Sequence, residues 1–304
     1  MSERQTPSRA AWKRFRGNRR AVLATVVLAF AVVAVAAGPW ISGQAANAGT
    51  DLPFAAPGPG HWFGTDIHGR DLLARVLAGT RISLLVGLVG AGVSVVIGVV
   101  WGMGSAYVGG RIDGIMMRCV DVLYALPNIV FVMLAITMLE EHAVRWLGIH
   151  AAGLAPAARE LLLFACLGAV SWLNMARVVR GQVLVLKECP FVLASRALGA
   201  SPVQILRRHV LPNIAGIVVV CAALTLPSVI LYESFLSFLG LGIRPPDASL
   251  GTLIEDGARQ LNPLRVRWWL LLGPGGVLAT VLLAFQWLGD GLRDALDPRS
   301  NPES

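Results

Sequence analysis

Six long apolar stretches decide what this chain of 304 residues can fold into. A helix needs about 20 mainly apolar residues to cross the hydrocarbon core of a bilayer, and its backbone polar groups must then be satisfied within the helix. The fourth stretch is short and extends through Arg177 toward Arg180, whose long side chains can reach the interface. The sequence therefore predicts an all-α membrane protein with six transmembrane helices. The six stretches are 21–41, 83–103, 122–139, 161–176, 210–232 and 268–289.

The distribution of lysine and arginine predicts how these helices are oriented. When the connections are assigned alternately to the two sides of the membrane, most of the 26 basic residues fall on one side. That side holds both chain ends and the connection 177–209. Because connections rich in lysine and arginine are typical of the cytoplasmic side, we expect both termini and this connection to be cytoplasmic.

Composition excludes other classes of protein. A net charge of +8 would suggest a nucleic-acid partner in a soluble chain, but 55% hydrophobic and 14% charged residues are typical of a membrane protein. The four cysteines have no CxxC spacing, so neither a disulfide framework nor a zinc site is indicated. The sequence predicts contact with membrane lipid and none with nucleic acid.

The chain divides into five consecutive regions under this interpretation. Its first apolar stretch is too long for a cleaved signal peptide, and Asp71 opens an amphipathic helix that we expect along the outer interface. The regions are a basic cytoplasmic leader (1–20), the first transmembrane helix (21–41), an external loop (42–82), a core of five transmembrane helices (83–289) and a cytoplasmic tail (290–304).

A polar and basic passage, residues 190–212, separates the fourth and fifth apolar stretches. Pro190 can begin a helix over 191–198, and Gly199 is the residue that a helix end tolerates best. Ser201 as N-cap and Pro202 as first helical residue then predict a second helix over 203–209. Both helices mix apolar residues with arginines, which favours docking on a protein surface. The alternative is an ordinary basic loop.

Small residues recur every three or four positions along the second apolar stretch. Such a stripe lets two helix backbones approach closely. The partner helix belongs either to another subunit or to this same chain, and the sequence favours neither alternative. The helix-packing residues are Gly87, Ala91, Ser94, Gly98 and Gly102.

Motifs of known catalysts are missing from the sequence. Lys13 and Lys187, the two lysines, lie outside any GxxxxGK[ST] loop, and neither GxSxG nor HExxH occurs. The side chains of His61, Asp66, His68 and Asp71 are of types that can bind a metal ion, but the same residue types form turns and helix caps. We expect no catalytic residue and no metal ligand.

Two acidic residues lie next to apolar stretches. Asp121 and Glu233 are at the margins of the third and fifth stretches, where we expect both to reach water. Ionisable residues near a membrane span are often functional, so Glu233 is a candidate for a translocation path.

The passage 190–212 resembles the central signature of the membrane subunits of bacterial ABC importers. That signature is EAA, three residues, glycine, nine residues and then IxLP. Here it falls on Leu193-Ala194-Ser195, Gly199 and His209-Val210-Leu211-Pro212. Leu193 replaces the glutamate, Ser195 the second alanine and His209 the isoleucine, and loss of the glutamate is usual in the peptide group. Further similar blocks are 64–66, 69–71, 79–84, 233–242 with Pro245 and Pro246, and 289–298.

With these blocks, the chain closely resembles C-type permease subunits of the peptide and nickel group. The resemblance implies the type I permease fold in the bacterial inner membrane, a related second permease subunit, two ATP-binding subunits and an external solute-binding protein. ATP and magnesium would bind to the ATP-binding subunits, and this chain would hold no cofactor. The residues implied in docking are Leu193, Ala194, Ser195, Arg196, Ala197, Leu198, Gly199, Ala200, Ser201, Pro202, Leu211 and Pro212.

The block 235–242 favours oligopeptides or dipeptides as the substrate. Nickel complexes and glutathione are alternatives for the same machinery. A secondary carrier driven by an ion gradient is a different class, for which charged sites near mid-span and paired internal repeats are expected. The sequence has neither an acid deep within an apolar stretch nor an obvious repeat.

Overall fold

The computed structural model describes residues 7–38, 40, 43, 45–125, 127, 129–134, 138, 156–243, 247–262 and 264–296. Helices account for most of this part of the chain, as predicted. They are α1 (Pro7–Gly17), α2 (Arg19–Ala36), α4 (Leu72–Val108), α5 (Gly110–Ala125), α7 (Pro156–Leu186), α8 (Pro190–Ala197), α9 (Pro202–Ile205), the π-helix η1 (Leu206–Val210), α10 (Leu211–Phe238), α11 (Leu250–Arg259) and α12 (Trp269–Leu296).

Five segments of the described chain are long and apolar enough to cross a membrane. These correspond to five of the six predicted stretches. The remaining one, 122–139, lies partly outside the described residues. The five segments are Arg19–Ala36, Leu72–Val108, Leu163–Leu186, Pro202–Phe238 and Trp269–Leu296.

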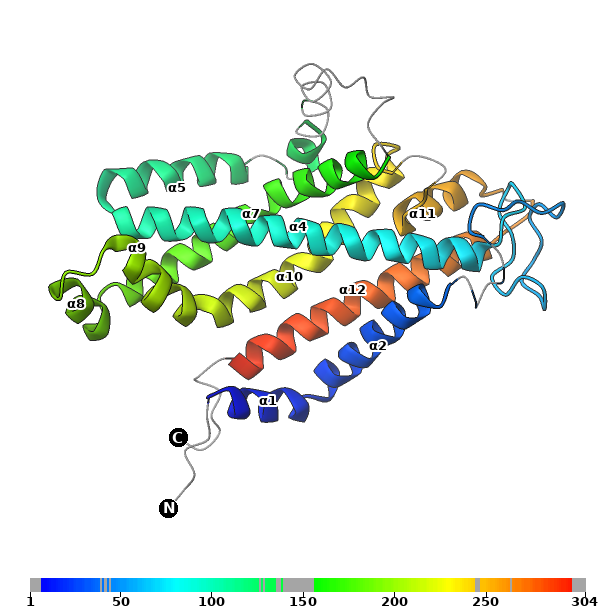
Figure 1. The fold of residues 1–304 in the computed structure, drawn as a ribbon. Helices are drawn as coiled ribbons and strands as arrows, with labels where there is room; N and C mark the ends of the chain where they lie inside the picture. Colours follow the sequence, from blue (N-terminus) through cyan, green and yellow to red (C-terminus); the bar gives the residue numbers. More distant parts are fainter. Residues whose placement is uncertain are drawn as a thin grey trace.

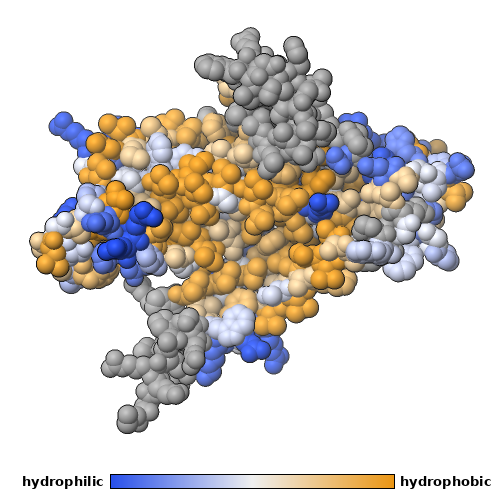
Figure 2. Space-filling view, viewed as in Figure 1, coloured by the Kyte–Doolittle hydropathy of each residue, from blue (hydrophilic) through white to orange (hydrophobic). Residues whose placement is uncertain are grey.

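The long helices run side by side and give the molecule two distinct ends (Figure 1). One end, called the knuckle end after the bent segment 190–210, carries α8, α9 and η1, and α1 and the last turn of α12 lie toward it. The loop end carries α11 and the segment 45–71. A broad hydrophobic band covers the side of the bundle between these more polar ends (Figure 2). This distribution is expected of a bundle whose sides face lipid.

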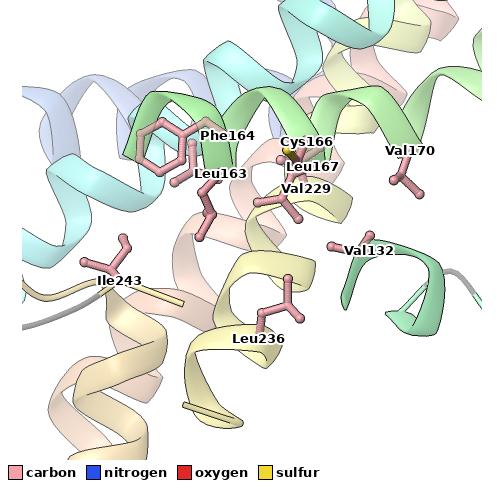
Figure 3. Packing of buried hydrophobic residues seen from close by; sticks show 10 residues of the cluster. Val132, Leu163, Phe164, Cys166, Leu167, Val170, Val229, Leu236 and Ile243 are labelled. Atoms are coloured by element: carbon pink, nitrogen blue, oxygen red, sulfur yellow. The ribbon is translucent and has the colours of Figure 1, made fainter. Parts of the chain in front are cut away.

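Helix α7 packs deep in the bundle against α4 and α10. Figure 3 shows side chains of α7 and α10 meeting in a buried apolar cluster. Leu167 and Val229 in this cluster are fully buried. The apolar contacts therefore fix the positions of α4, α7 and α10 relative to one another. Other labelled members are Val132, Leu163, Phe164, Cys166, Val170, Leu236 and Ile243.

The small residues of α4 lie against helices of the same chain. A Cβ atom added to Gly98 would lie 2.6 Å from the Cβ of Met175 on α7, and one added to Gly87 would lie 2.9 Å from Ile230 on α10. The observed contacts correspond to the alternative in which the stripe packs inside one chain. All five stripe residues are buried: Gly87, Ala91, Ser94, Gly98 and Gly102.

Helix α4 begins earlier than predicted. It is one continuous helix of 37 residues from Leu72, so the amphipathic segment after Asp71 is the start of the long helix and not a separate helix along the interface. The Asp71 side chain accepts a hydrogen bond from the Ala74 amide at 2.8 Å and caps this start. Gly79 lies against the backbone of Ser249 and Leu250. The apolar face of this segment is therefore covered by protein, which the sequence pattern could not reveal.

Candidate functional site

The passage 190–210 folds into α8, a turn, α9 and η1, and we call this segment the knuckle. Pro190 is the first residue of α8, where its missing N–H costs nothing. The chain leaves α8 through Gly199, whose φ of 82° is strained for any residue with a side chain. The Gly199 amide donates to the Arg196 carbonyl at 3.0 Å and the Ala200 amide donates to the Ser195 carbonyl at 3.1 Å. These bonds close the end of α8.

The second half of the knuckle begins with a reciprocal cap. The Gln204 amide donates to the Ser201 hydroxyl at 3.4 Å, and the Ser201 amide donates to the Gln204 side chain at 2.9 Å. Instead of the separate helix predicted over 203–209, α9 passes into η1 and then directly into α10. Pro212 has no N–H and its ring crowds the carbonyl one turn earlier, which is consistent with a wider π turn at this point. The knuckle is therefore continuous with a membrane-spanning helix.

Two buried side chains anchor the knuckle to the bundle. Val192 of α8 is 4% exposed and Ile205 of α9 is 1% exposed, and both belong to a cluster with Val179 and Ile214. Burying two such side chains stabilises the arrangement by about 3 to 6 kcal/mol. The knuckle is therefore held on α7 and α10 by apolar packing.

The outer side of the knuckle is apolar and exposed. Leu198 is 89% exposed, Val203 62%, Leu193 45% and Phe191 44%. We call these four residues the knuckle tip. Exposed arginines accompany the tip at positions 196, 207 and 208. Large apolar side chains that protrude at a polar end of a membrane protein are typical of a contact with another protein.

The structure brings most of the predicted docking residues together. Leu193 to Pro202 form the end of α8, the turn and the start of α9, whereas Leu211 and Pro212 lie at the start of α10. Phe191 and Val203 are exposed beside them but are missing from the predicted set. Their position in the same two short helices is the signal that would have included them.

Ion pairs hold α5 to α7 near the knuckle end. The Arg180 guanidinium donates two hydrogen bonds of 2.6 Å to Asp113, and Arg177 donates one of 2.7 Å to Asp121. The hydrogen bonds from Arg180 hold the pKa of Asp113 below its ordinary value. The sequence suggested that both arginines reach for the interface, and the structure instead pairs them with acids on α5.

Glu233 does not reach water, so the prediction for its environment is wrong. Its side chain is fully buried, and the Ser237 hydroxyl donates to Glu233 Oε1 at 2.6 Å. Helix α10 extends to Phe238, and α11 folds back on it, with Gly251 packed directly on Ser234. Asp121, in contrast, has a side chain that is 62% exposed, as predicted.

The histidines and aspartates of the segment 61–71 form turns and caps. His61 Nδ1 lies 2.8 Å from Asp71 Oδ2. Asp66 accepts hydrogen bonds from the amides of His68 and Arg70 at 2.8 and 2.9 Å. The Arg70 and Arg75 side chains also donate to it, at 2.6 and 2.7 Å. Within the described chain, no group of three or more histidine, cysteine or acidic side chains is placed to hold a metal ion.

Burial raises the pKa of Asp66, but the hydrogen bonds and charge of Arg70 and the His68 amide outweigh it. The pKa of this carboxyl therefore lies below its ordinary value. Asp66 and Arg75 have side chains that are 6% and 5% exposed. They form a buried ion pair that ties the segment before α4 to α4 itself.

Comparison with known sequences shows the class of protein to which this chain belongs. Residues 94–302 match the family described as binding-protein-dependent transport system inner membrane component. The chain therefore belongs to this family, and it is a multi-pass permease subunit of the inner membrane and not a catalytic subunit. Residues 6–57 match a second family, described as the N-terminal TM domain of oligopeptide transport permease C.

Individual relatives place the chain more narrowly among C-type permeases. It is 44% identical to the oligopeptide transport system permease protein OppC of Escherichia coli strain K12, over 94% of this chain and 89% of the relative. It is 41% identical to OppC of Haemophilus influenzae, over 98% and 92%. It is also 40% identical to the dipeptide transport system permease protein DppC of Bacillus subtilis, over 95% and 85%.

Proposed function

We propose that this chain is the C-type permease subunit of an ATP-driven importer for oligopeptides or dipeptides. The relatives that cover nearly the whole chain carry oligopeptide or dipeptide transport in their names. In this proposal the chain forms half of the translocation path, and a related permease subunit forms the other half. A solute-binding protein delivers the peptide on the outer side.

The proposed topology has six transmembrane helices with both termini in the cytoplasm. The third of these helices would cover residues 122–139. Support comes from the basic residues of α1, α5, α8 and η1, because these elements lie toward the same end of the bundle (Figure 1). An end rich in lysine and arginine is expected on the cytoplasmic side.

The observation that carries the proposal is the exposed apolar tip on a knuckle that continues into α10. In the proposal, two cytoplasmic ATP-binding subunits bind ATP and magnesium, and one of them holds the knuckle tip. Movement of the ATP-binding subunits would then pass through η1 into α10. A segment that continues without a break into a membrane helix can transmit movement from one end of that helix to the other.

Transport by the reconstituted complex tests this proposal. Proteoliposomes would contain this chain, its second permease subunit and its two ATP-binding subunits, with the solute-binding protein outside. We expect uptake of radiolabelled trialanine that requires both ATP inside and the binding protein outside. Uptake driven by an ion gradient without ATP would overturn the proposal. Uptake of nickel complexes or glutathione in place of peptides would overturn the assignment of substrate.

A further inference from the structure

A polar cavity opens between α5, α7 and α10. Its volume is about 260 Å³, and it is lined largely by hydroxyl and amide side chains. Ser171 and Asn174 come from α7, and Thr225 and Ser228 come from α10. All four belong to segments that are long and apolar enough to cross the membrane. The cavity therefore places uncharged polar groups where the outer face of a spanning helix is normally apolar.

The polar groups of this wall are open to the cavity. Asn174 and Ser228 are exposed, and Ser171 and Thr225 are partly exposed. The Ser171 hydroxyl donates to the Leu167 carbonyl at 2.9 Å, and the Thr225 hydroxyl donates to the Cys221 carbonyl at 2.8 Å. Because their protons are used within the helices, these two oxygens remain available as acceptors. The Asn174 amide offers both donors and an acceptor.

The wall carries no formal charge among its lining residues, which also include Val170, Leu173, Cys221, Leu224 and the rings of Tyr124 and Tyr232. At the edge of the cavity, the Arg177 guanidinium lies 4.3 Å from the centre of the Tyr124 ring. Asp121 pairs with the same guanidinium at 2.7 Å. The opposite charges of Arg177 and Asp121 therefore offset one another.

An exposed hydroxyl or amide group within a membrane span can form hydrogen bonds when it faces water or a polar ligand. When it faces lipid, these hydrogen bonds are missing and the group costs free energy. A peptide bond offers one donor and one acceptor at each residue. Serine, threonine and asparagine side chains complement both groups without selecting a particular side chain. A wall that lacks charge also does not favour peptides of one net charge over the other.

We propose that this cavity is the peptide-contacting part of this chain's translocation path, and that its uncharged groups hydrogen-bond to the peptide backbone. Ser171, Asn174, Thr225 and Ser228 are the contacting residues. The inference rests on the proposed function, because it assumes that peptides are the cargo. The cavity replaces the buried Glu233 as the candidate for the translocation path.

A charge placed in the cavity tests the inference by creating selectivity. In the reconstituted complex, uptake of three labelled tripeptides would be compared, namely trialanine, Ala-Lys-Ala and Ala-Glu-Ala, each normalised to its affinity for the binding protein. We expect Asn174→Asp to change the uptake ratio of the lysine peptide to the glutamate peptide at least five-fold in favour of the lysine peptide. The unaltered complex should transport both at similar normalised rates.

A matched pair of threonines controls for effects on folding. Thr225 lines the cavity, and Thr280 is an exposed threonine of α12 whose hydroxyl donates in the same way to the Gly276 carbonyl, at 2.7 Å. We expect Thr225→Leu to slow uptake of all three peptides several-fold and Thr280→Leu to leave uptake unchanged. Equal effects of both substitutions would contradict the assignment of the cavity.

Thiol labelling separates a transport path from a contact between subunits. With the four native cysteines replaced by alanine, Ser228→Cys would be treated with a charged thiol reagent in the assembled complex. We expect labelling whose rate changes when ATP is added. A thiol that stays shielded in every nucleotide state would show that the second permease subunit covers the cavity, and would overturn the inference.

If trialanine uptake by the unaltered complex is intact while Asn174→Asp is without effect, the inference fails and the proposed function stands.

Discussion

At each end of the bundle a helix is followed by a glycine with a positive φ, but the chain continues differently after the two glycines. Gly199 at the knuckle end and Gly240 at the loop end both close a helix with a positive φ, of 82° and 77°. A Cβ atom added to either would meet nothing within 4 Å. Exposed apolar side chains lie on both sides of Gly199 in the knuckle, whereas beyond Gly240 the chain folds back, with Gly242 packed on Ser237. The same type of helix end can therefore lead into a projecting turn or fold the chain back on its own helix.

The two ends also differ in their buried polar side chains. The loop end buries polar side chains with their partners, such as Asp66 with Arg75 and Glu233 with Ser237. Both ends also expose large apolar side chains, of which Leu198 at 89% belongs to the knuckle tip and Leu264 at 91% belongs to the loop end. Polar groups that are buried and hydrogen-bonded are typical of a protein interior. Exposed apolar side chains, in contrast, indicate a surface that another molecule covers. The following substitutions test this contrast, from the largest expected effect to the smallest.

Removing one partner of the buried ion pair should have the largest effect. Arg75→Met leaves Asp66 buried with Arg70 as its remaining cation, and losing one partner of such a pair costs about 3 to 5 kcal/mol. We expect a clear fall in the melting temperature of the detergent-solubilised chain. Arg259→Ala is the control, because Arg259 is 70% exposed in its pair with Glu255, and exposed pairs contribute about 0 to 1 kcal/mol. Equal melting temperatures for both variants would contradict the account of the loop end.

A charge on the knuckle tip should act on binding and not on stability. For Leu198→Asp we expect the affinity for the ATP-binding subunits to fall about 30-fold, which corresponds to the roughly 2 kcal/mol of a central interface residue. Titration of the purified permease pair with the ATP-binding subunits measures this affinity. Leu264 at the loop end is 91% exposed, so Leu264→Asp is a matched control that should bind normally. Normal binding by Leu198→Asp would break the contrast between the ends.

Alanine at the two cap glycines separates strain from function. Gly199→Ala and Gly240→Ala each force a side chain into the left-handed region, at a cost of about 1 to 2 kcal/mol. We expect similar losses of thermal stability from both. Only Gly199→Ala should lower peptide-stimulated ATP hydrolysis, because only that turn positions the knuckle tip. Equal loss of ATP hydrolysis in both variants would show that the effect is one of folding alone.

The smallest effect is a dependence of stability on pH at the loop end. The pKa of Asp66 is lower in the folded chain than in the unfolded chain, so its charged form stabilises the fold above about pH 4. This contribution is lost as the pH falls from about 4 through the folded pKa. We expect the melting temperature to fall more steeply over this range in the unaltered chain than in Asp66→Asn. Parallel curves would show that Asp66 does not contribute.

Local signals predicted the knuckle well, because its form depends on neighbouring residues. Pro190, Gly199, Ser201 and Pro202 set a helix start, a helix end and a second start without help from the rest of the chain. The apolar stretches likewise predicted the spanning helices that the structure describes, since lipid imposes one length and one polarity on every span.

Features that depend on contacts between residues far apart in the sequence were not predicted. The burial of Glu233 depends on α11, and Gly79 in the first part of α4 is covered by the backbone at Ser249 and Leu250. Arg180 and Asp113 pair across 67 positions. The polar wall of the cavity combines two helices whose hydroxyl groups are scattered in the sequence. Such contacts are tertiary, and no local pattern encodes them.

Cross-linking at the knuckle tip tests the central claim most directly. Leu198→Cys, in a chain whose four native cysteines are replaced by alanine, would be treated in inside-out membrane vesicles with a short thiol-reactive cross-linker. We predict a covalent product with an ATP-binding subunit, and no labelling of this cysteine by an impermeant thiol reagent applied to intact cells. Labelling from outside the cell, or a tip that never cross-links to an ATP-binding subunit, would contradict the account.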